Sequence, residues 1–197
     1  MMNKRIAITG GIGSGKSIVG EYLKKKGFTV FSCDKIYAEL ITTENYIQAI
    51  KQAFPTAVAD GRVDKSVLSN IIFSDITERE KLNQIAHPLI MQSLDEQMRA
   101  CEGVVFAEVP LLFEGGFEGL FDEIIVIKRN LTDRIVAICQ RDGLQEDKAR
   151  LRIQSQFDYD SRAFIERTKD LSVYILNNDA PLETLFKRID AYVANIK

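Results

Sequence analysis

The chain has 197 residues, of which 46% are hydrophobic and 27% are charged, and its formal net charge is −2. A chain of this length forms one compact α/β domain with an insertion more readily than two independent domains. Its charge lacks the basic excess that is typical of nucleic-acid-binding proteins, so we expect no nucleic-acid partner and only local basic sites.

The cysteines and the N-terminal sequence bear on the cellular compartment. Cys33, Cys101 and Cys139 are odd in number and widely spaced, which argues against a disulfide framework. The N-terminus lacks the long apolar segment of a signal peptide, and no apolar run approaches the length of a membrane span. We therefore expect a cytoplasmic protein without a membrane partner.

The first thirty residues alternate between strand-like and helix-like patterns. Residues 5–9 (RIAIT) are short, apolar and β-branched, which predicts a buried strand. Apolar residues at helical spacing follow from residue 18 to residue 23, and Gly27 is the expected helix cap. Residues 28–31 predict a second strand that ends shortly before Asp34.

Residues 35–101 have a different, helical character. Apolar positions at helical spacing predict one helix that stops at Pro55 and a second one around residues 67–72. Asp75 is the expected cap of a third helix that ends at His87, and Pro88 suits the first turn of a fourth. A block of roughly sixty residues is far longer than a usual connection between two elements, so we interpret it as an inserted subdomain.

The C-terminal half returns to the alternating pattern. Strands are predicted at residues 104–109, 123–127 and 173–176, and an amphipathic helix over residues 182–193 closes the chain. Between the last two strands, Thr132 or Asp133 is the expected cap of a helix that reaches Gly143, and the charged residues 145–156 predict another helix. Strands that alternate with helices imply a mostly parallel sheet covered on both faces.

Residues 10–17 (GGIGSGKS) match the P-loop pattern, in which glycines let the backbone approach a ligand without Cβ clashes. Successive N–H groups at a helix N-terminus then form a nest for an anion. Lys16 supplies charge for the β- and γ-phosphates, and the Ser17 hydroxyl suits Mg²⁺. A chance glycine-rich turn is improbable, because every fixed position matches between a predicted strand and a predicted helix. The expected phosphate-binding residues are Gly11, Gly13, Ser14, Gly15, Lys16, Ser17 and Ile18.

Three acidic residues lie at or beyond the ends of predicted strands, where ligands bind in doubly wound sheets. Asp34 is suited to accept a proton from an attacking hydroxyl or to orient that hydroxyl, and it is equally suited to cap a helix. Glu108 stands where an acid would contact Mg²⁺ through water, or it is an ordinary polar strand end. Glu114 is a second acid near the site, or it forms a salt bridge that braces a loop.

Basic residues in and near the charged helix suggest a mobile flap over the site. Arg141 and Arg152 are suited to stabilise the charge of a transferring phosphoryl group, whereas for Arg150 we favour a solvated helix face. The single histidine, His87, is more often structural in such a position than catalytic. No guanine-specific NKxD motif is present, so the small size and the helical insertion favour a small-molecule kinase over a GTPase.

Together these residues resemble the dephospho-CoA kinase family over nearly the whole chain. The P-loop is generic, but the other motifs in this order are specific to that family. Ile18 stands where many relatives have threonine, and Glu108 stands where aspartate is common. The matching segments are residues 6–17, Asp34, residues 86–90 (AHPLI), residues 109–114 (VPLLFE), residues 141–144 (RDGL), residues 152–156 (RIQSQ) and Asn177-Asn178.

The resemblance implies an ATP-dependent kinase that phosphorylates the ribose 3′-hydroxyl of 3′-dephospho-CoA with Mg²⁺, giving CoA and ADP in the last step of coenzyme A biosynthesis. It implies an α/β P-loop NTPase fold, a three-layer α/β/α sandwich with a mostly parallel sheet. The implied core comprises residues 1–34, 99–137 and 164–197. The implied acceptor-binding insertion is the helical segment 35–98, and the implied helical lid comprises residues 138–163.

The resemblance also implies roles for single residues. Asp34 matches the catalytic aspartate, with Lys16 and Arg141 compensating charge on the phosphates. Asn177 or Asn178 would lie near the adenine, although a loop-capping asparagine is an alternative. The implied substrate-side residues are Asp34, His87, Leu111 and Glu114. We expect a monomer or a weak homo-oligomer.

Two other classes of protein fit part of the sequence. A different P-loop kinase, such as a nucleoside monophosphate kinase, would share the core and the lid but not residues 109–114. A non-catalytic nucleotide-binding module would bind ATP without needing an acceptor. Turnover of ATP without and with an acceptor distinguishes these classes.

Overall fold

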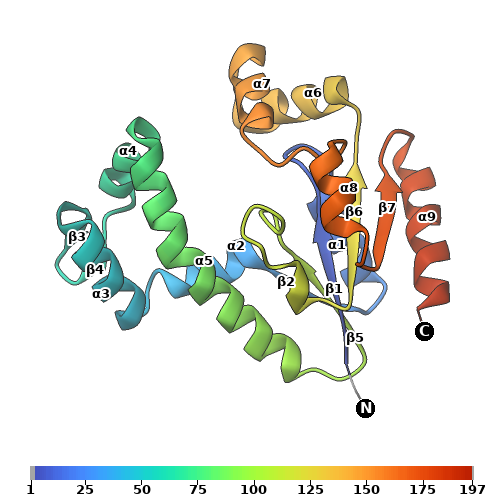
Figure 1. Cartoon of the computed structure of the whole chain (residues 1–197), viewed down its shortest axis with the longest axis horizontal. Helices are drawn as coiled ribbons and strands as arrows, with labels where there is room; N and C mark the ends of the chain where they lie inside the picture. Colours follow the sequence, from blue (N-terminus) through green and yellow to red (C-terminus); the bar gives the residue numbers. More distant parts are fainter. Residues whose placement is uncertain (1–2, 197) are drawn as a thin grey trace. The chain divides into compact units, whose positions relative to one another are not determined.

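The computed structural model describes residues 3–196, and the chain divides into two compact units (Figure 1). The first unit comprises the chain up to Phe31 and from Met98 onward, and the second comprises Ser32–Gln97. Among the described residues, no helix combines the length and the apolar character needed to cross a bilayer.

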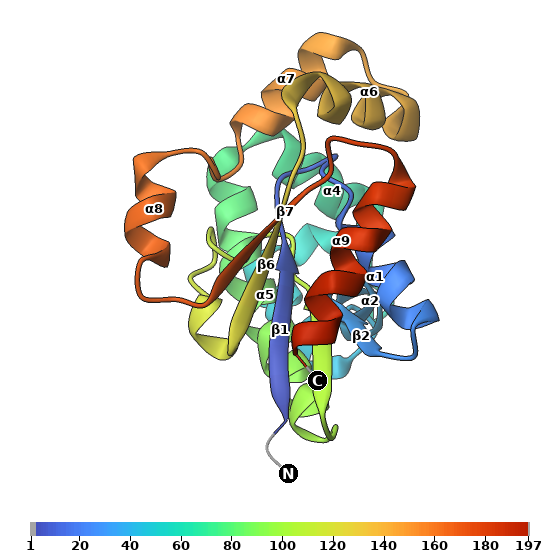
Figure 2. The same cartoon turned by 90° about the vertical axis from the view of Figure 1, so that its right-hand side faces the viewer.

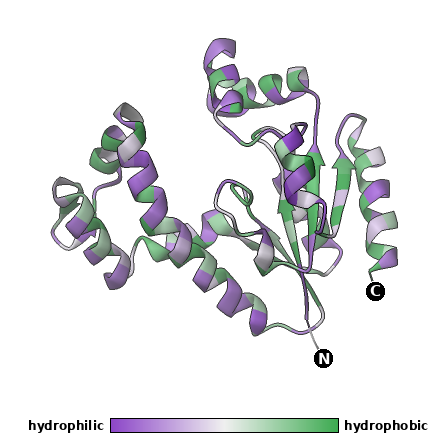
Figure 3. Ribbon diagram, in the orientation of Figure 1, coloured by the Kyte–Doolittle hydropathy of each residue, from purple (hydrophilic) through white to green (hydrophobic). Residues whose placement is uncertain are grey.

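A five-stranded sheet with the order β2-β5-β1-β6-β7 forms the middle of the first unit. β1 pairs in parallel with β5 and β6, and β6 pairs in parallel with β7. Residues 6–9 of β1 are fully buried, because parallel strands are covered on both faces, and Figure 3 shows hydrophobic colour along these strands. The predicted strands are confirmed to within one residue at each end. They are β1 (Lys4–Thr9), β2 (Thr29–Ser32), β5 (Val104–Glu108), β6 (Glu123–Lys128) and β7 (Val173–Asn177).

Helices cover both faces of this sheet, which confirms the α/β class. α1 (Lys16–Lys25) and α9 (Leu182–Asn195) place their apolar stripes in one core cluster with β1. α8 (Arg162–Thr168), which the sequence did not predict, lies on the other side of the sheet from α9 (Figure 2). A short 3₁₀ turn, η2 (Glu118–Leu120), precedes β6.

Two helices, α6 (Leu131–Asp142) and α7 (Glu146–Gln154), leave the sheet after β6 and pack on each other. The cap of α6 is Asn130, whose side chain accepts a hydrogen bond of 2.9 Å from the N–H of Asp133. The predicted caps, Thr132 and Asp133, are therefore wrong, because the helix begins one residue before Thr132. Gly143 ends α6 with a φ of 65°, as its sequence position predicts.

The second unit is mostly helical, as expected, but it also contains a two-residue hairpin. Val58–Ala59 and Arg62–Val63 pair in antiparallel fashion, and the turn between them has positive φ at Asp60 and Gly61. Positive φ at both turn residues is the geometry that an Asp-Gly pair favours in tight hairpins. The elements of the second unit are α2 (Cys33–Leu40), α3 (Glu44–Ala53), η1 (Pro55–Ala57), β3 (Val58–Ala59), β4 (Arg62–Val63), α4 (Lys65–Ser74) and α5 (Ile76–Arg99).

The break predicted between His87 and Pro88 is wrong, because α5 runs from Ile76 to Arg99 with Pro88 inside it. Proline removes one backbone donor and disfavours a helix interior. Here the buried positions continue at helical spacing on both sides of the proline, so one apolar stripe favours one helix. These buried residues are Leu82, Ala86, Ile90, Met91 and Leu94. Asp75 accepts a hydrogen bond of 2.7 Å from the N–H of Thr77, as a cap does.

Candidate active site

The P-loop connects the end of β1 to the start of α1. Gly10, Gly13 and Gly15 have φ values of 141°, 77° and 102°, which residues with a Cβ rarely adopt. Among the described residues, the N–H groups of Gly13, Gly15 and Ser17 have no acceptor within the protein. Such N–H groups at a helix N-terminus form a nest suited to phosphate oxygens.

Lys16, the first residue of α1, reaches back over this loop. Its Nζ donates to the carbonyl oxygens of Gly10 at 2.8 Å and of Gly11 at 3.1 Å. The side chains of Ser17 and Ile18 are exposed at the start of the helix. The loop therefore presents a positive charge and a hydroxyl next to the N–H groups of the nest.

Side chains from distant segments hold the carbonyl groups of the loop. Asn178 Nδ2 donates to Ser14 O at 2.8 Å, and Arg129 Nη1 donates to Gly13 O at 3.3 Å. Arg134 Nε donates to Ile12 O at 2.9 Å. The roles of Arg129 and Arg134 were missed, because no local pattern in the sequence shows which arginines reach the loop.

The two consecutive asparagines after β7 differ in environment. Asn178 is buried against the P-loop, and its own N–H donates to Lys128 O at 2.8 Å. Asn177 is exposed at the end of β7, and its carbonyl accepts from Arg188. Asn178 therefore has the role of an asparagine that caps a loop. A contact between Asn177 and the adenine stays a prediction.

Gly13 illustrates why the loop needs glycine. A Cβ added at Gly13 would lie 2.7 Å from the backbone oxygen of Arg134 and 3.1 Å from its Cα, and the backbone of α6 cannot move away as a side chain can. We expect Gly13→Ala to lower the free energy of unfolding by about 1–3 kcal/mol through backbone strain. We also expect ATP affinity to fall at least about tenfold, since the nest is distorted.

The matched control for this substitution is Gly27→Ala. Gly27 has a φ of 89°, but no atom lies within 4 Å of its added Cβ. The control should lose about 1–2 kcal/mol from the left-handed backbone alone and keep its ATP affinity. Thermal unfolding and ATP titration of both variants provide the check. Equal effects of the two substitutions on ATP binding would contradict the steric argument.

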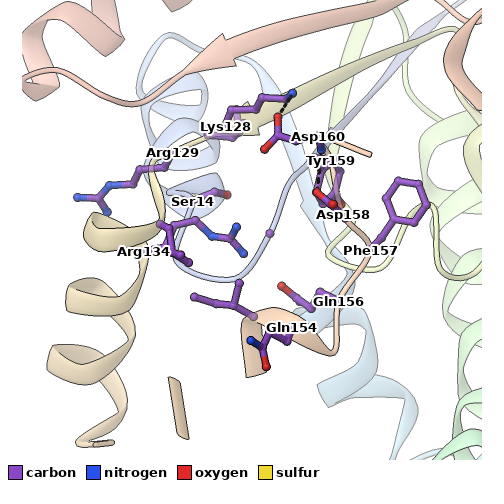
Figure 4. Close-up of a pocket in the computed structure, with 14 residues that line it drawn as sticks. Ser14, Lys128, Arg129, Arg134, Gln154, Gln156, Phe157, Asp158, Tyr159 and Asp160 are labelled. Carbon is purple, nitrogen blue, oxygen red and sulfur yellow. Dashed lines mark hydrogen bonds and ion pairs between the residues drawn. The ribbon is translucent and has the colours of Figure 1, made fainter. Parts of the chain in front are cut away.

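A pocket of about 370 Å³ adjoins the P-loop (Figure 4). Gly11 and Ser14 line it from the loop, together with residues 127–129, 131 and 134 and residues 153, 154 and 156–160. Lys128 forms an ion pair of 2.6 Å with Asp160 at its edge. Burial lowers the pKa of the Arg134 guanidinium. The nearby Tyr159, Asp160 and Asp158 partly offset this lowering. The pocket wall therefore carries both basic and acidic groups.

An aromatic cluster supports the segment that follows α7. Phe113 stacks on Phe157 with ring centroids 5.2 Å apart and packs edge-on against Phe164. Tyr159 is buried beside it, and its hydroxyl lies 3.1 Å from Thr9 Oγ1 at the end of β1. This burial raises the pKa of Tyr159 to about 12, so its phenol is neutral at physiological pH.

Residues 109–114 place two predicted substrate-side residues next to this cluster. Glu114 is exposed, and its Oε1 accepts a hydrogen bond of 2.9 Å from the N–H of Phe157. Glu114 therefore braces the loop through a backbone hydrogen bond. Leu111 is half-buried, and its carbonyl accepts from Gly115 at 3.0 Å.

Glu108 lies against the helix whose second residue is Ser17, the other predicted metal-binding residue. The Glu108 carboxylate lies beside Gly20 of α1. Its Oε2 is 3.7 Å from the position that a Cβ would occupy on Gly20. Gly20 is three residues after Ser17, so Gly20 and Ser17 lie on the same face of α1. Among the described residues, no cluster of three His, Cys, Asp or Glu side chains is placed to hold a metal. Mg²⁺ needs no such cluster, since it usually takes one or two protein oxygens together with water and phosphate.

Arg141 lies at the end of α6, where its side chain is 62% exposed. Its Nε donates to Asp142 Oδ1 at 2.7 Å, and Arg152 donates to the other oxygen of that carboxylate at 2.9 Å. Hydrogen bonding to Arg141 lowers the pKa of Asp142. Arg150 pairs with Glu146 on the surface of α7 at 2.6 Å, in agreement with a solvated helix face.

Asp34 and His87 belong to the second unit. Asp34 lies in the first turn of α2, and the residue at the N-cap is Ser32, so the interpretation of Asp34 as a helix cap is wrong. Its carboxylate is exposed at a helix N-terminus, where the dipole favours negative charge. His87 is half-buried in the middle of α5.

Comparisons with known proteins cover both units. The family model for dephospho-CoA kinase matches residues 4–183. A dephospho-CoA kinase from Fusobacterium nucleatum is 34% identical over 194 residues, which cover 97% of each chain. A solved structure of a Thermus thermophilus protein superposes with a TM-score of 0.81 at 32% identity over 100% of both chains. A dephospho-CoA kinase from Campylobacter jejuni shares the fold, with a TM-score of 0.65 and 22% identity over 100% of this chain and 99% of that one.

Proposed function

The chain belongs to the dephospho-CoA kinase family, and we propose that its P-loop binds Mg²⁺-ATP while Asp34 directs the ribose 3′-hydroxyl of 3′-dephospho-CoA at the γ-phosphate. The reaction of this ATP-dependent kinase gives CoA and ADP. The observation that carries the proposal is the complete P-loop nest with Lys16, in a chain that matches the family model over residues 4–183.

The phosphate chain of ATP would lie along the loop from Gly11 to Ile18. The N–H groups of Gly13, Gly15 and Ser17, which have no acceptor among the described residues, would donate to phosphate oxygens, and Lys16 would add a charge that compensates the β- and γ-phosphates. Ser17 would hold Mg²⁺ directly and Glu108 would hold it through water. The ion neutralises phosphate charge and fixes the phosphate geometry when it is bound.

The acceptor hydroxyl would be oriented by the exposed carboxylate of Asp34. Phosphoryl transfer has a loose transition state, so the carboxylate needs only to hold the hydroxyl in line and accept its proton as the bond forms. We propose that His87, Leu111 and Glu114 bind dephospho-CoA. Glu114 is held in place by its hydrogen bond to Phe157.

Arg141 would approach the phosphates from the lid, residues 138–163. Its exposed guanidinium and its position at the end of α6 suit a group that engages when the lid closes. Closure excludes water, which suppresses transfer of the phosphoryl group to water. Asn177, exposed at the end of β7, would lie near the adenine.

We assign the acceptor-binding role to residues 35–98 and the ATP-binding role to the core, residues 1–34, 99–137 and 164–197. In support of the assignment, the structure divides close to these bounds, with Ser32–Gln97, which includes Asp34, as a unit of its own. We further propose a cytoplasmic enzyme that is a monomer or a weak homo-oligomer and whose partners are its two substrates.

The proposed function is tested by ADP release with Mg²⁺-ATP and one acceptor at a time. The acceptors are dephospho-CoA, AMP, CMP and none, with mass spectrometry of the product and an EDTA-treated control. We expect ADP release with dephospho-CoA alone, one added phosphoryl group on it, and loss of turnover in EDTA. A product NMR spectrum places the phosphate. Release with a nucleotide acceptor would indicate a nucleotide kinase, and release without any acceptor would indicate an ATPase.

A further inference from the structure

Ile12 of the P-loop has both of its backbone polar groups bonded to side chains of the segment that contains α6 and α7. Its carbonyl accepts from Arg134 Nε at 2.9 Å, and its N–H donates to Gln156 Oε1 at 2.6 Å. Arg134 lies on α6, and Gln156 follows the end of α7 by two residues; both are drawn in Figure 4. The loop is therefore held from two segments that are far from it in sequence.

The Ile12 side chain forms a third attachment to the same region. It packs against the small buried cluster in which α6 and α7 meet, formed by Ile135, Ile138 and Ala149. A single residue of the P-loop is thus tied to the α6–α7 pair by two hydrogen bonds and by apolar packing. Movement of this pair must either carry Ile12 along or break these contacts.

The planarity of the peptide bond gives these contacts a consequence for the nest. The carbonyl of Ile12 and the N–H of Gly13 belong to one rigid peptide unit, so Arg134 sets the direction of the first N–H of the nest. The N–H of Ile12 shares its unit with the carbonyl of Gly11, which accepts from Lys16 Nζ at 3.1 Å. Gln156 therefore sets the direction of a carbonyl that holds the lysine.

We propose that Arg134 and Gln156 are positioning residues that hold the phosphate-binding conformation of the P-loop through the backbone of Ile12, and so couple ATP affinity to the α6–α7 pair. The proposal rests on the ATP site proposed above. Neither residue needs to contact the nucleotide for this role, since each acts on a peptide unit whose other end faces the ligand or Lys16.

The position of Arg134 also explains a feature of the loop sequence. A Cβ at Gly11 would collide with the guanidinium of Arg134, and a Cβ at Gly13 would collide with its backbone oxygen. The backbone of Arg134 thus requires glycine at position 13, whereas a Cβ at position 11 would displace the guanidinium from its present place.

The experiment compares substitutions that keep or remove the hydrogen bond to Ile12. Arg134→Met and Gln156→Met remove it and keep a side chain that reaches the position of the bonding atom, whereas Arg134→Gln keeps an N–H donor at the position of Nε and removes the charge. We expect each Met variant to bind ATP about tenfold more weakly, which is the effect of one hydrogen bond of ordinary strength. We expect Arg134→Gln to stay within about threefold of the wild type, because the donor is kept.

The control is Arg150→Gln, an exposed arginine of α7 that is paired with Glu146. Its ATP affinity should remain within about twofold of the wild type, as for a surface ion pair. Calorimetric ATP titration and thermal unfolding without nucleotide are measured for every variant. A positioning role raises the Kd and the KM for ATP of the folded protein beyond any small loss of stability, whereas a merely structural role lowers the unfolding temperature and the folded fraction alone.

Each outcome decides between alternatives. Unchanged ATP affinity in both Met variants would overturn the proposal. Equal losses in Arg134→Gln and Arg134→Met that vanish at high salt would also overturn it, because they would show that the charge of Arg134 acts directly on the phosphates. Failure of the wild type to bind ATP would instead refute the proposed ATP site.

Discussion

Replacing Asp34 by asparagine is expected to lower kcat by a factor of about 10²–10⁴, the usual contribution of a positioned general base. The amide keeps the size of the side chain but cannot accept the proton of the 3′-hydroxyl. Because Asp34 is exposed and does not cap α2, the unfolding temperature should hardly change. ATP affinity should also be kept, since the phosphate nest and Lys16 belong to a different segment of the chain.

The matched control is Glu39→Gln, a second exposed carboxylate on the same helix α2. Steady-state ADP release with dephospho-CoA and ATP titration should show wild-type behaviour for this variant. Turnover of Asp34→Asn within about threefold of the wild type would remove Asp34 from the mechanism. Equal losses in both variants would instead indicate a general effect of charge on α2.

The sequence predicted the first unit well because its signals are local. The strand β1 is apolar on both faces from Ile6 to Ile8, and the P-loop that follows has a fixed spacing of glycines, lysine and serine. A buried parallel strand and a phosphate nest each need particular residues at particular positions. Patterns of this kind can be recognised without knowledge of any distant contact.

The errors occurred where a local rule competed with a longer pattern. Pro88 is a helix breaker by local chemistry, but the apolar stripe of α5 continues past it and decides the outcome. The hairpin at Asp60-Gly61 was missed although the Asp-Gly pair is a turn signal, because its strands have only two residues each. Strands this short carry too few side chains for an alternating pattern.

The contacts of the candidate site were the least predictable part. Asn178 and Gln156 bond to residues of the P-loop that are 164 and 144 positions away in the sequence. Only the packing of α6, α7 and β7 around the loop brings these side chains to it, and packing is a property of the whole fold. The sequence identified Asn178 as one of two candidates but gave no signal for Arg134.

Replacing Lys16 by methionine is expected to lower kcat/KM for ATP by a factor of about 10²–10³, the effect of removing one preorganised donor from a transition state. The lysine ammonium donates to the carbonyls of Gly10 and Gly11, so the loop itself holds its charge beside the nest. A charge that is held in place needs little reorganisation during transfer, and methionine supplies none. The loop carbonyls also lose their donor, which should lower the free energy of unfolding by about 1 kcal/mol.

The matched control for Lys16 is Lys24→Met on the same helix. Lys24 forms an ion pair of 2.6 Å with Glu21 on the surface of α1, and such pairs contribute only about 0.5 kcal/mol. Steady-state kinetics and ATP titration should therefore distinguish the two variants clearly. A normal kcat/KM for ATP in Lys16→Met would contradict the prediction, because it would show that the N–H groups of the nest alone compensate the phosphate charge. The loss in Lys16→Met should persist at high salt, because a charge held inside the loop is poorly screened, whereas any effect in Lys24→Met should disappear.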